Sequence, residues 1–167
     1  MNLGAGRIVY QDLAKINLAV EQDRLREEPV LKEAFAYAKA ASKPVHFLGL
    51  LSDGGVHSHI NHLKGLISAA ESFGVSQSFV HAFTDGRDTP PQSILKYLPS
   101  IEDALHQAGG DIATISGRYF AMDRDSRWDR TERAWRAMIL GQGRHAHDAE
   151  QALASAGHWR PHLIILD

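Results

Sequence analysis

The chain has 167 residues, a formal net charge of −2 and no cysteine. A charge this close to neutral excludes the overall basic field that holds nucleic acid or an anionic membrane. The absence of cysteine excludes disulfides and thiolate metal sites. No apolar run is long enough to span a bilayer, and residues 1–7 lack the apolar core of a signal peptide. We therefore expect a cytoplasmic protein that binds neither nucleic acid nor membranes.

Two helices are predicted before the first strand. Residues 10–22 carry apolar side chains at helical spacing on one face. Pro29 suits the first turn of a second helix, where a backbone N–H has no helical partner to lose. Pro44 ends that segment.

From Val45 onward the chain repeats a strand, a polar segment and a helix three times. Short apolar runs predict strands at Val45–Leu51, Ser78–Phe83 and Asp111–Ser116. The first run is almost continuously apolar, as expected for a strand that is covered on both faces. The helices after these strands begin near Ile60, Ile94 and Trp128 and end at Gly74, Gly109 and Gly141.

The pattern weakens after Gly143, where residues 148–156 predict a short helix and residues 162–166 a final strand. Strands that alternate with helices imply right-handed crossovers and parallel pairing. The predicted fold is α/β: a mainly parallel sheet with helices on both faces, in a single three-layer domain over residues 1–167.

Polar side chains follow each predicted strand where it ends. The first end carries Asp53 and His57, the second Arg87 and Asp88, and the third Arg118 and Arg124. In open parallel sheets ligands bind beyond the carboxyl ends of the strands. Because arginine presents a fork of donors that suits carboxylate and phosphate oxygens, this edge predicts a site for a small, multiply charged anion.

Plainer interpretations stay open for the same residues. The segment from Gly117 to Arg130 is also typical of a loop and a solvated, salt-bridged helix start, in which Arg127 and Arg130 pair with Asp129 or Glu132. Asp88 either shapes a turn or binds or deprotonates a substrate hydroxyl.

The histidines fall into two groups. His57, His59 and His62 lie close enough in the chain to suggest a metal site, but no Glu or Cys completes a ligand set. We favour His57 as a residue that contacts an anion or exchanges a proton. His46 and His81 lie inside strands and are expected to be hydrogen-bonded core or interface residues.

Three long motifs carry a resemblance to a known family. They are Leu50 to His59 (LLSDGGVHSH), His81 to Pro91 (HAFTDGRDTPP) and Ser116 to Asp125 (SGRYFAMDRD). Together with the opening residues from Asn2, they resemble cofactor-independent phosphoglycerate mutase, and the resemblance runs to about Gly143.

The resemblance implies an activity and a set of residues. The family interconverts 3-phosphoglycerate and 2-phosphoglycerate through a phosphoserine enzyme, with a phosphatase-like domain that holds two manganese ions. An inserted α/β domain grips the glycerate, and this chain resembles that domain. The implied substrate-binding residues are His57, Arg87, Asp88, Arg118 and Arg124, with Asp88 as the catalytic one, while Asp53 is left a loop-shaping role.

Neither the nucleophilic serine nor the metal ligands of the phosphatase-like domain can be placed in this chain. We therefore expect a fragment that holds the glycerate-binding half, contains no metal or cofactor and is inactive alone. The alternative is a non-catalytic binding or oligomerisation module, in which an exposed sheet edge joins two copies.

Overall fold

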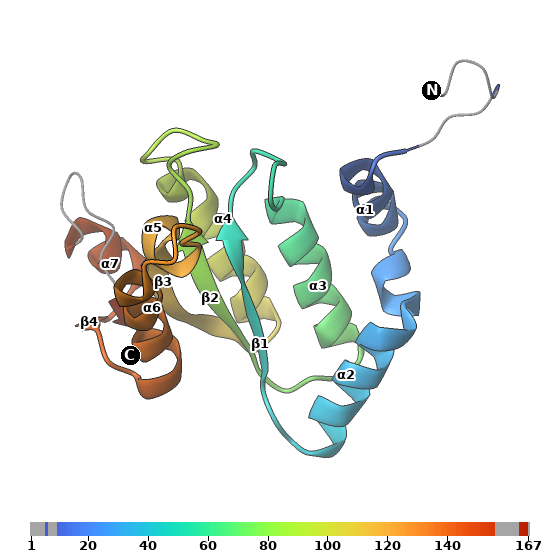
Figure 1. The fold of residues 1–167 in the computed structure, drawn as a ribbon. Coiled ribbons are helices and arrows are strands. Elements are labelled where there is room, and N and C mark those ends of the chain that lie inside the picture. Colours follow the sequence, from blue (N-terminus) through green and yellow to red (C-terminus); the bar gives the residue numbers. More distant parts are fainter. Residues whose placement is uncertain (1–5, 7–9, 156–163, 167) are drawn as a thin grey trace.

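The fold is organised around a sheet that runs in the order β1-β2-β3-β5-β4 (Figure 1). The computed structural model describes residue 6, residues 10–155 and residues 164–166. Strands β1 (Val45–Leu51), β2 (Ser78–Thr84) and β3 (Asp111–Gly117) are parallel, which confirms the predicted strands to within a residue. The sheet continues through β5 (Ile164–Leu166), which is antiparallel to β3, and β4 (Arg144–Ala146), which pairs with β5 in parallel.

The main core lies between this sheet and the two crossover helices, α3 (Ile60–Ser72) and α4 (Ile94–Gln107). Both crossovers step along the sheet in the same direction, so their right-handed connections place both helices on one face. Ile67, Ile101 and Leu105 are buried against Val80 and Ile112 of the strands. The helix α7 (Ala149–Ser155) joins the same core through Ala152. Residues 156, 162 and 163 of the predicted C-terminal elements lie outside the described residues.

The opposite face is covered over β3 by α5 (Arg118–Ala121) and α6 (Trp128–Leu140). Ala134 and Ala137 are the buried residues of α6, and their small side chains let the helix approach the sheet closely. The segment after Gly117 therefore opens with a helical turn and not with the loop that the sequence predicts. At one side of the molecule α1 (Asp12–Glu21), the 3-10 turn η2 (Arg24–Glu27) and α2 (Pro29–Ala40) flank α3 (Figure 1).

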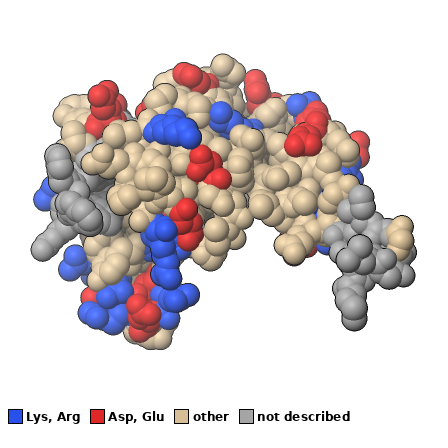
Figure 2. All heavy atoms as spheres, turned by 90° about the horizontal axis from the view of Figure 1, so that it is seen from above, with Lys and Arg blue, Asp and Glu red and all other residues tan. Residues whose placement is uncertain are grey.

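The second face of β1 is not covered as the sequence predicts. Leu48 is 57% exposed and His46 is exposed, although Leu50 on the same face is buried. A run of apolar residues does not reveal that α5 and α6 pack over β3, two strands away. Figure 2 shows a recess between the left and right parts of the molecule on this side.

His46 and His81 are hydrogen-bonded, as expected, and they bond to each other; His81 is buried, but His46 is exposed and is not a core residue. The distance between His46 Nδ1 and His81 Nε2 is 2.9 Å, and His81 Nδ1 lies 2.8 Å from Thr114 Oγ1. Burial lowers the pKa of His81 below its ordinary value, and repulsion from His46 lowers it further. His81 is thus a neutral, hydrogen-bonded residue of the sheet.

The predicted helix ends are confirmed where glycine is required. Gly74 and Gly141 have φ values of +77° and +62°, which a residue with a side chain rarely adopts, and they follow α3 and α6. Gly110 is required for a different reason: a Cβ atom there would clash with the carbonyl oxygen of Ser78, at 1.9 Å. None of the described helices is long and apolar enough to cross a membrane.

Candidate anion-binding site

The carboxyl ends of the three parallel strands lie level with one another. Leu51 of β1 is in register with Thr84 of β2, and Thr84 is in register with Gly117 of β3. The segments that leave these strands therefore start from the same edge of the sheet. Seen from above, the molecule carries basic and acidic side chains intermingled, without one extended basic field (Figure 2).

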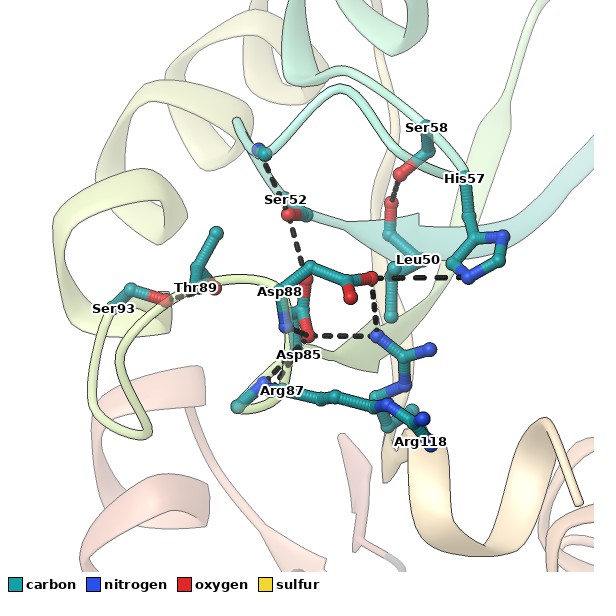
Figure 3. Close-up of polar contacts among 12 residues, drawn as sticks. Leu50, Ser52, His57, Ser58, Asp85, Arg87, Asp88, Thr89, Ser93 and Arg118 are labelled. Atoms are coloured by element: carbon teal, nitrogen blue, oxygen red, sulfur yellow. Dashed lines mark hydrogen bonds and ion pairs between the residues drawn. The ribbon is translucent and has the colours of Figure 1, made fainter.

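Asp85, the first residue after β2, is the centre of the polar contacts at this edge (Figure 3). Its Oδ1 atom accepts hydrogen bonds from the backbone N–H groups of Gly86, Arg87 and Asp88 at 2.7, 3.0 and 3.1 Å. Its Oδ2 atom accepts a 2.8 Å hydrogen bond from Ser52 Oγ, which follows β1. Burial alone would raise the pKa of Asp85, but the backbone and hydroxyl hydrogen bonds outweigh it and lower the pKa.

Arg118 joins the third strand end to the second. Its Nη1 atom donates to Asp85 Oδ1 at 2.9 Å and to Asp88 Oδ2 at 2.6 Å, and its side chain is 17% exposed. Burial would lower the pKa of Arg118, yet the hydrogen bonds to Asp88 and Asp85 raise it, so the guanidinium stays charged. Both Nη1 hydrogens are committed to carboxylates, which leaves the Nη2 and Nε donors for a ligand.

His57 completes the connected part of the site from the first strand end. Its Nε2 atom lies 3.8 Å from Asp88 Oδ2, and its side chain is 50% exposed. The same oxygen of Asp88 therefore contacts both an arginine and a histidine. The structure brings together His57, Asp88 and Arg118, which come from three separate segments of the sequence.

The other two expected arginines are placed differently. Arg87 is held through its backbone N–H, and Figure 3 shows its side chain reaching toward the side where Arg118 lies. Arg124 is exposed in the segment between α5 and α6. Neither guanidinium has a hydrogen bond or ion pair with another residue that the structure describes. The Arg87 guanidinium thus lies beside the connected group without a described carboxylate partner, whereas the structure does not join Arg124 to that group.

Sequence reasoning missed Ser52 and Asp85. Asp85 precedes a glycine at a strand end, which is the pattern of an aspartate that caps the backbone two residues on. That pattern predicts a turn but does not reveal the bonds to Ser52 and Arg118. Asp53, expected to shape its loop, accepts hydrogen bonds from Tyr97 and, at 3.4 Å, from Lys96, both on α4.

The histidines of the first loop do not converge as metal ligands. His59 Nδ1 accepts a hydrogen bond from the backbone N–H of Asn61 at 3.2 Å. His62 Nε2 lies 2.6 Å from Asn17 Oδ1 of α1. Within the described part of the chain no group of three or more His, Cys, Asp or Glu residues could hold a metal ion. The metal site that these histidines suggested is therefore not assembled among the described residues.

The remaining arginines of the third segment support the start of α6. Arg127 pairs with Asp129 at 3.2 Å, as predicted. The prediction for Arg130 was wrong, since it pairs with Asp123 at 3.0 Å and Asp125 at 3.5 Å. Helical side chains point back toward the N-terminus, which directs Arg130 to the preceding loop. Its guanidinium also lies 4.0 Å from the centre of the Tyr119 ring.

Comparison with known proteins gives a family match over most of the chain. The family model described as "BPG-independent PGAM N-terminus (iPGM_N)" matches residues 16–160, which extends past Gly143. A 2,3-bisphosphoglycerate-independent phosphoglycerate mutase of Flavobacterium psychrophilum is 53% identical over 93% of this chain and 31% of its own length. The Flavobacterium johnsoniae protein of the same name is 58% identical over 86% of the chain and 28% of its own length.

A solved structure shows the same fold. It is the phosphoglycerate mutase of Leishmania mexicana, determined at low cobalt concentration, with a TM-score of 0.87 and 30% sequence identity. The match covers 96% of this chain and 32% of that one. The chain thus spans about a third of the length of the relatives that it matches.

Proposed function

Because the chain belongs to the family of the BPG-independent phosphoglycerate mutase N-terminus, we propose that it is the part of such a mutase that binds phosphoglycerate. The reaction is the interconversion of 3-phosphoglycerate and 2-phosphoglycerate. The observation that carries the proposal is the convergence of three strand ends on Arg118, Asp88 and His57, with the free guanidinium of Arg87 beside them.

Each side chain has a role that its contacts support. The Nη2 and Nε donors of Arg118 bind an oxygen pair of the carboxylate or phosphate, because its Nη1 hydrogens are taken up by Asp85 and Asp88. Arg87 and Arg124, which have no described partner, supply the further positive charge that a phosphoglycerate requires.

Asp88 is the residue we propose to act on the glycerate hydroxyl. A hydroxyl that receives a phosphoryl group must lose its proton, and a carboxylate within hydrogen-bond reach accepts it. Arg118 and His57 both contact Oδ2 of Asp88 and keep the carboxylate oriented. When the phosphoryl group leaves the other glycerate oxygen, that oxygen takes up the proton from Asp88, so the protons balance over one turnover.

Phosphoryl transfer itself is assigned to another part of the enzyme. The phosphatase-like domain of the resembled family supplies a serine to carry the phosphoryl group and two manganese ions to stabilise its charge. Since the described residues offer no metal site, we propose that this chain binds substrate in the cytoplasm but does not turn it over alone.

Titration of the chain with 3-phosphoglycerate tests the proposal. We expect a dissociation constant on the order of millimolar, because the partner domain's contacts are missing. Arg118→Ala and Arg124→Ala should each weaken binding about tenfold or more, since a charge-assisted hydrogen bond contributes about 1.5–3 kcal/mol. Arg136→Ala is the control, because Arg136 pairs with Glu132 on the surface of α6.

Two results would contradict the proposal. Binding that is unaffected by both Arg118→Ala and Arg124→Ala would remove the site assignment. Mutase turnover by the purified chain, with or without added manganese, would remove the claim that it is inactive alone.

A second candidate function rests on the open side of β1. This strand is the edge of the sheet, and Leu48 is 57% exposed there. An unpaired edge strand with an apolar side chain favours association with a second copy. Light scattering at increasing concentration tests this, and a chain that stays monomeric rules the association out.

A further inference from the structure

We propose that Asp85 is a positioning residue, which fixes the three strand-end segments relative to one another and aims the free edge of Arg118 at the bound anion. The inference rests on the proposed function for the identity of the ligand. It concerns a residue that the resemblance does not assign to the substrate.

The first support is the reach of this one side chain. Its carboxylate contacts Ser52 after β1, the backbone from Gly86 to Asp88 after β2, and Arg118 after β3. Ser52 and Arg118 are each 33 residues away in the sequence. Asp85 therefore connects the segments that carry His57, Asp88 and Arg118.

The second support is that the two carboxylate oxygens of Asp85 bond to different segments. Oδ1 accepts the three N–H groups of its own loop together with Arg118 Nη1. Among the described residues, Oδ2 accepts a hydrogen bond only from Ser52 Oγ, and Ser52 Oγ in turn accepts a 3.0 Å hydrogen bond from the backbone N–H of Gly54. Through Ser52, Asp85 therefore also holds the backbone at Gly54, in the loop that carries His57.

The third support is the geometry forced on Arg118. Its Nη1 atom is held between Asp85 and Asp88, and two acceptors on one nitrogen fix the plane of the guanidinium. The Nη2 and Nε donors then lie on the free edge of that plane. Without Asp85 a single contact to Asp88 would let the guanidinium rotate, and its free edge would no longer have one direction.

Asp85 does not itself touch the ligand. Its side chain is 0% exposed, whereas Asp88 and Arg118 are partly exposed at 16% and 17%. Direct binding or proton exchange with a substrate is therefore left to Asp88. Asp85 acts through Arg118 and through the loop of Asp88.

The test is a double-mutant cycle of Asp85→Asn with Arg118→Ala, read as affinity for 3-phosphoglycerate. The asparagine retains a carbonyl oxygen for the backbone N–H groups but loses the charge that orients Arg118. We expect Asp85→Asn to weaken binding about tenfold with Arg118 present and less than about twofold in the Arg118→Ala background. A merely structural role would lower affinity equally in both backgrounds, and that result overturns the proposal. Glu132→Gln, which uncouples the exposed Arg136, controls for loss of one negative charge.

A second readout needs no ligand. In the wild-type chain we expect separate, slowly exchanging NMR signals for the Arg118 Nη hydrogens, since two carboxylates hold them. In Asp85→Asn these signals should merge, and unchanged signals overturn the proposal. If the wild-type chain binds no phosphoglycerate, the proposed function fails, while the NMR signals still decide whether Asp85 positions Arg118.

Ser52→Ala is the variant to use if Asp85→Asn does not fold. It removes the hydrogen bond to Oδ2 and the acceptor of the Gly54 N–H, and it leaves Arg118 in contact with Oδ1. We expect faster hydrogen exchange at the Gly54 amide and a loss of affinity of about threefold. Unchanged exchange and unchanged affinity would show that Asp85 does not connect the first loop to the site.

Discussion

Two aspartates hold loops at the same edge of the molecule, and they differ in how far they reach. Asp85 and Asp123 are both buried, with 0% and 3% of their side chains exposed, and each accepts backbone N–H groups and one arginine. The arginine of Asp123 is seven residues away in the sequence, whereas that of Asp85 is 33 residues away. The same local arrangement therefore shapes one loop at Asp123 and joins three segments at Asp85.

The two arginines bond to carboxylates in the same way, through Nη1, and differ in what lies beside the rest of the guanidinium. Arg118 retains unused donors after bonding to Asp85 and Asp88. Arg130 bonds to Asp123 and Asp125 and covers the ring of Tyr119. Both arginines use Nη1 for two carboxylates, so the aromatic ring that lies against the Arg130 guanidinium is what distinguishes them. The following changes test this distinction between the two regions.

The largest effect is expected from Asp85→Ala. It leaves Arg118 with a single carboxylate and orphans three backbone N–H groups in a buried position. We expect the free energy of unfolding to fall by about 3 kcal/mol, as for other buried ion pairs that lose one partner. Urea unfolding measures this, and a loss under about 1 kcal/mol would show that Asp85 is no more than a turn residue.

Arg118→Ala and Arg124→Ala should separate stability from binding. Arg118→Ala leaves Asp85 and Asp88 without their shared cation, so we expect unfolding free energy to fall by about 1–3 kcal/mol. Arg124 has no described partner, so its removal should change stability by less than about 0.5 kcal/mol. Thermal unfolding compares the two, and equal losses would mean that Arg124 has a structural role as well.

Asp123→Ala should be milder than Asp85→Ala and confined to its own loop. The amides of Asp125 and Arg127 lose their acceptor, so they should exchange faster with solvent. The amides of Arg87 and Asp88 should keep their protection. Hydrogen exchange followed residue by residue measures both loops at once. Faster exchange in the Asp85 loop would show that the two regions are coupled.

The smallest effect concerns pH, and it separates the Asp85 contacts from the sheet beneath them. The pKa of His81 is lowered in the folded chain, so between pH 7.5 and 5.5 the unfolded chain binds more protons. The free energy of unfolding therefore falls as the pH falls. The pKa of Asp85 is also lowered, but its stabilising effect persists down to about pH 4, the ordinary pKa of aspartate. His81→Gln should therefore reduce the loss of stability between pH 7.5 and 5.5, while Asp85→Asn should leave that loss unchanged. Urea unfolding at both pH values measures this.

The sequence predicts the parallel strands well because each is a short apolar run bounded by glycine or a polar segment. It does not predict α5, which is a single turn and too short for helical spacing to show. It also misses β4, where Arg144 and His145 alternate with no apolar pattern and only pairing with β5 makes a strand. The open face of β1 is missed because the position of α6 over β3 is a tertiary property.

The candidate site was predictable to the extent that it depends on the ends of strands. His57, Asp88 and Arg118 each follow a predicted strand, and parallel pairing alone brings them to one edge. Asp85 was not predictable as the central residue, because its importance comes from partners that are distant in sequence. Arg124 lies apart from His57, Asp88 and Arg118 because the turn of α5 intervenes, and no local sequence pattern predicts that turn.

The order β1-β2-β3-β5-β4 has a consequence for how the chain assembles. β1, β2 and β3 pair in the order in which a ribosome would release them, each with the strand just made. β4 is synthesised next but has no partner until β5 arrives, because β5 lies between it and β3. Contacts that wait for distant segments form late. The edge of the sheet that carries the arginines can thus be complete while the β4 side is still open, so a stalled or nascent chain would already present the side chains of the candidate site.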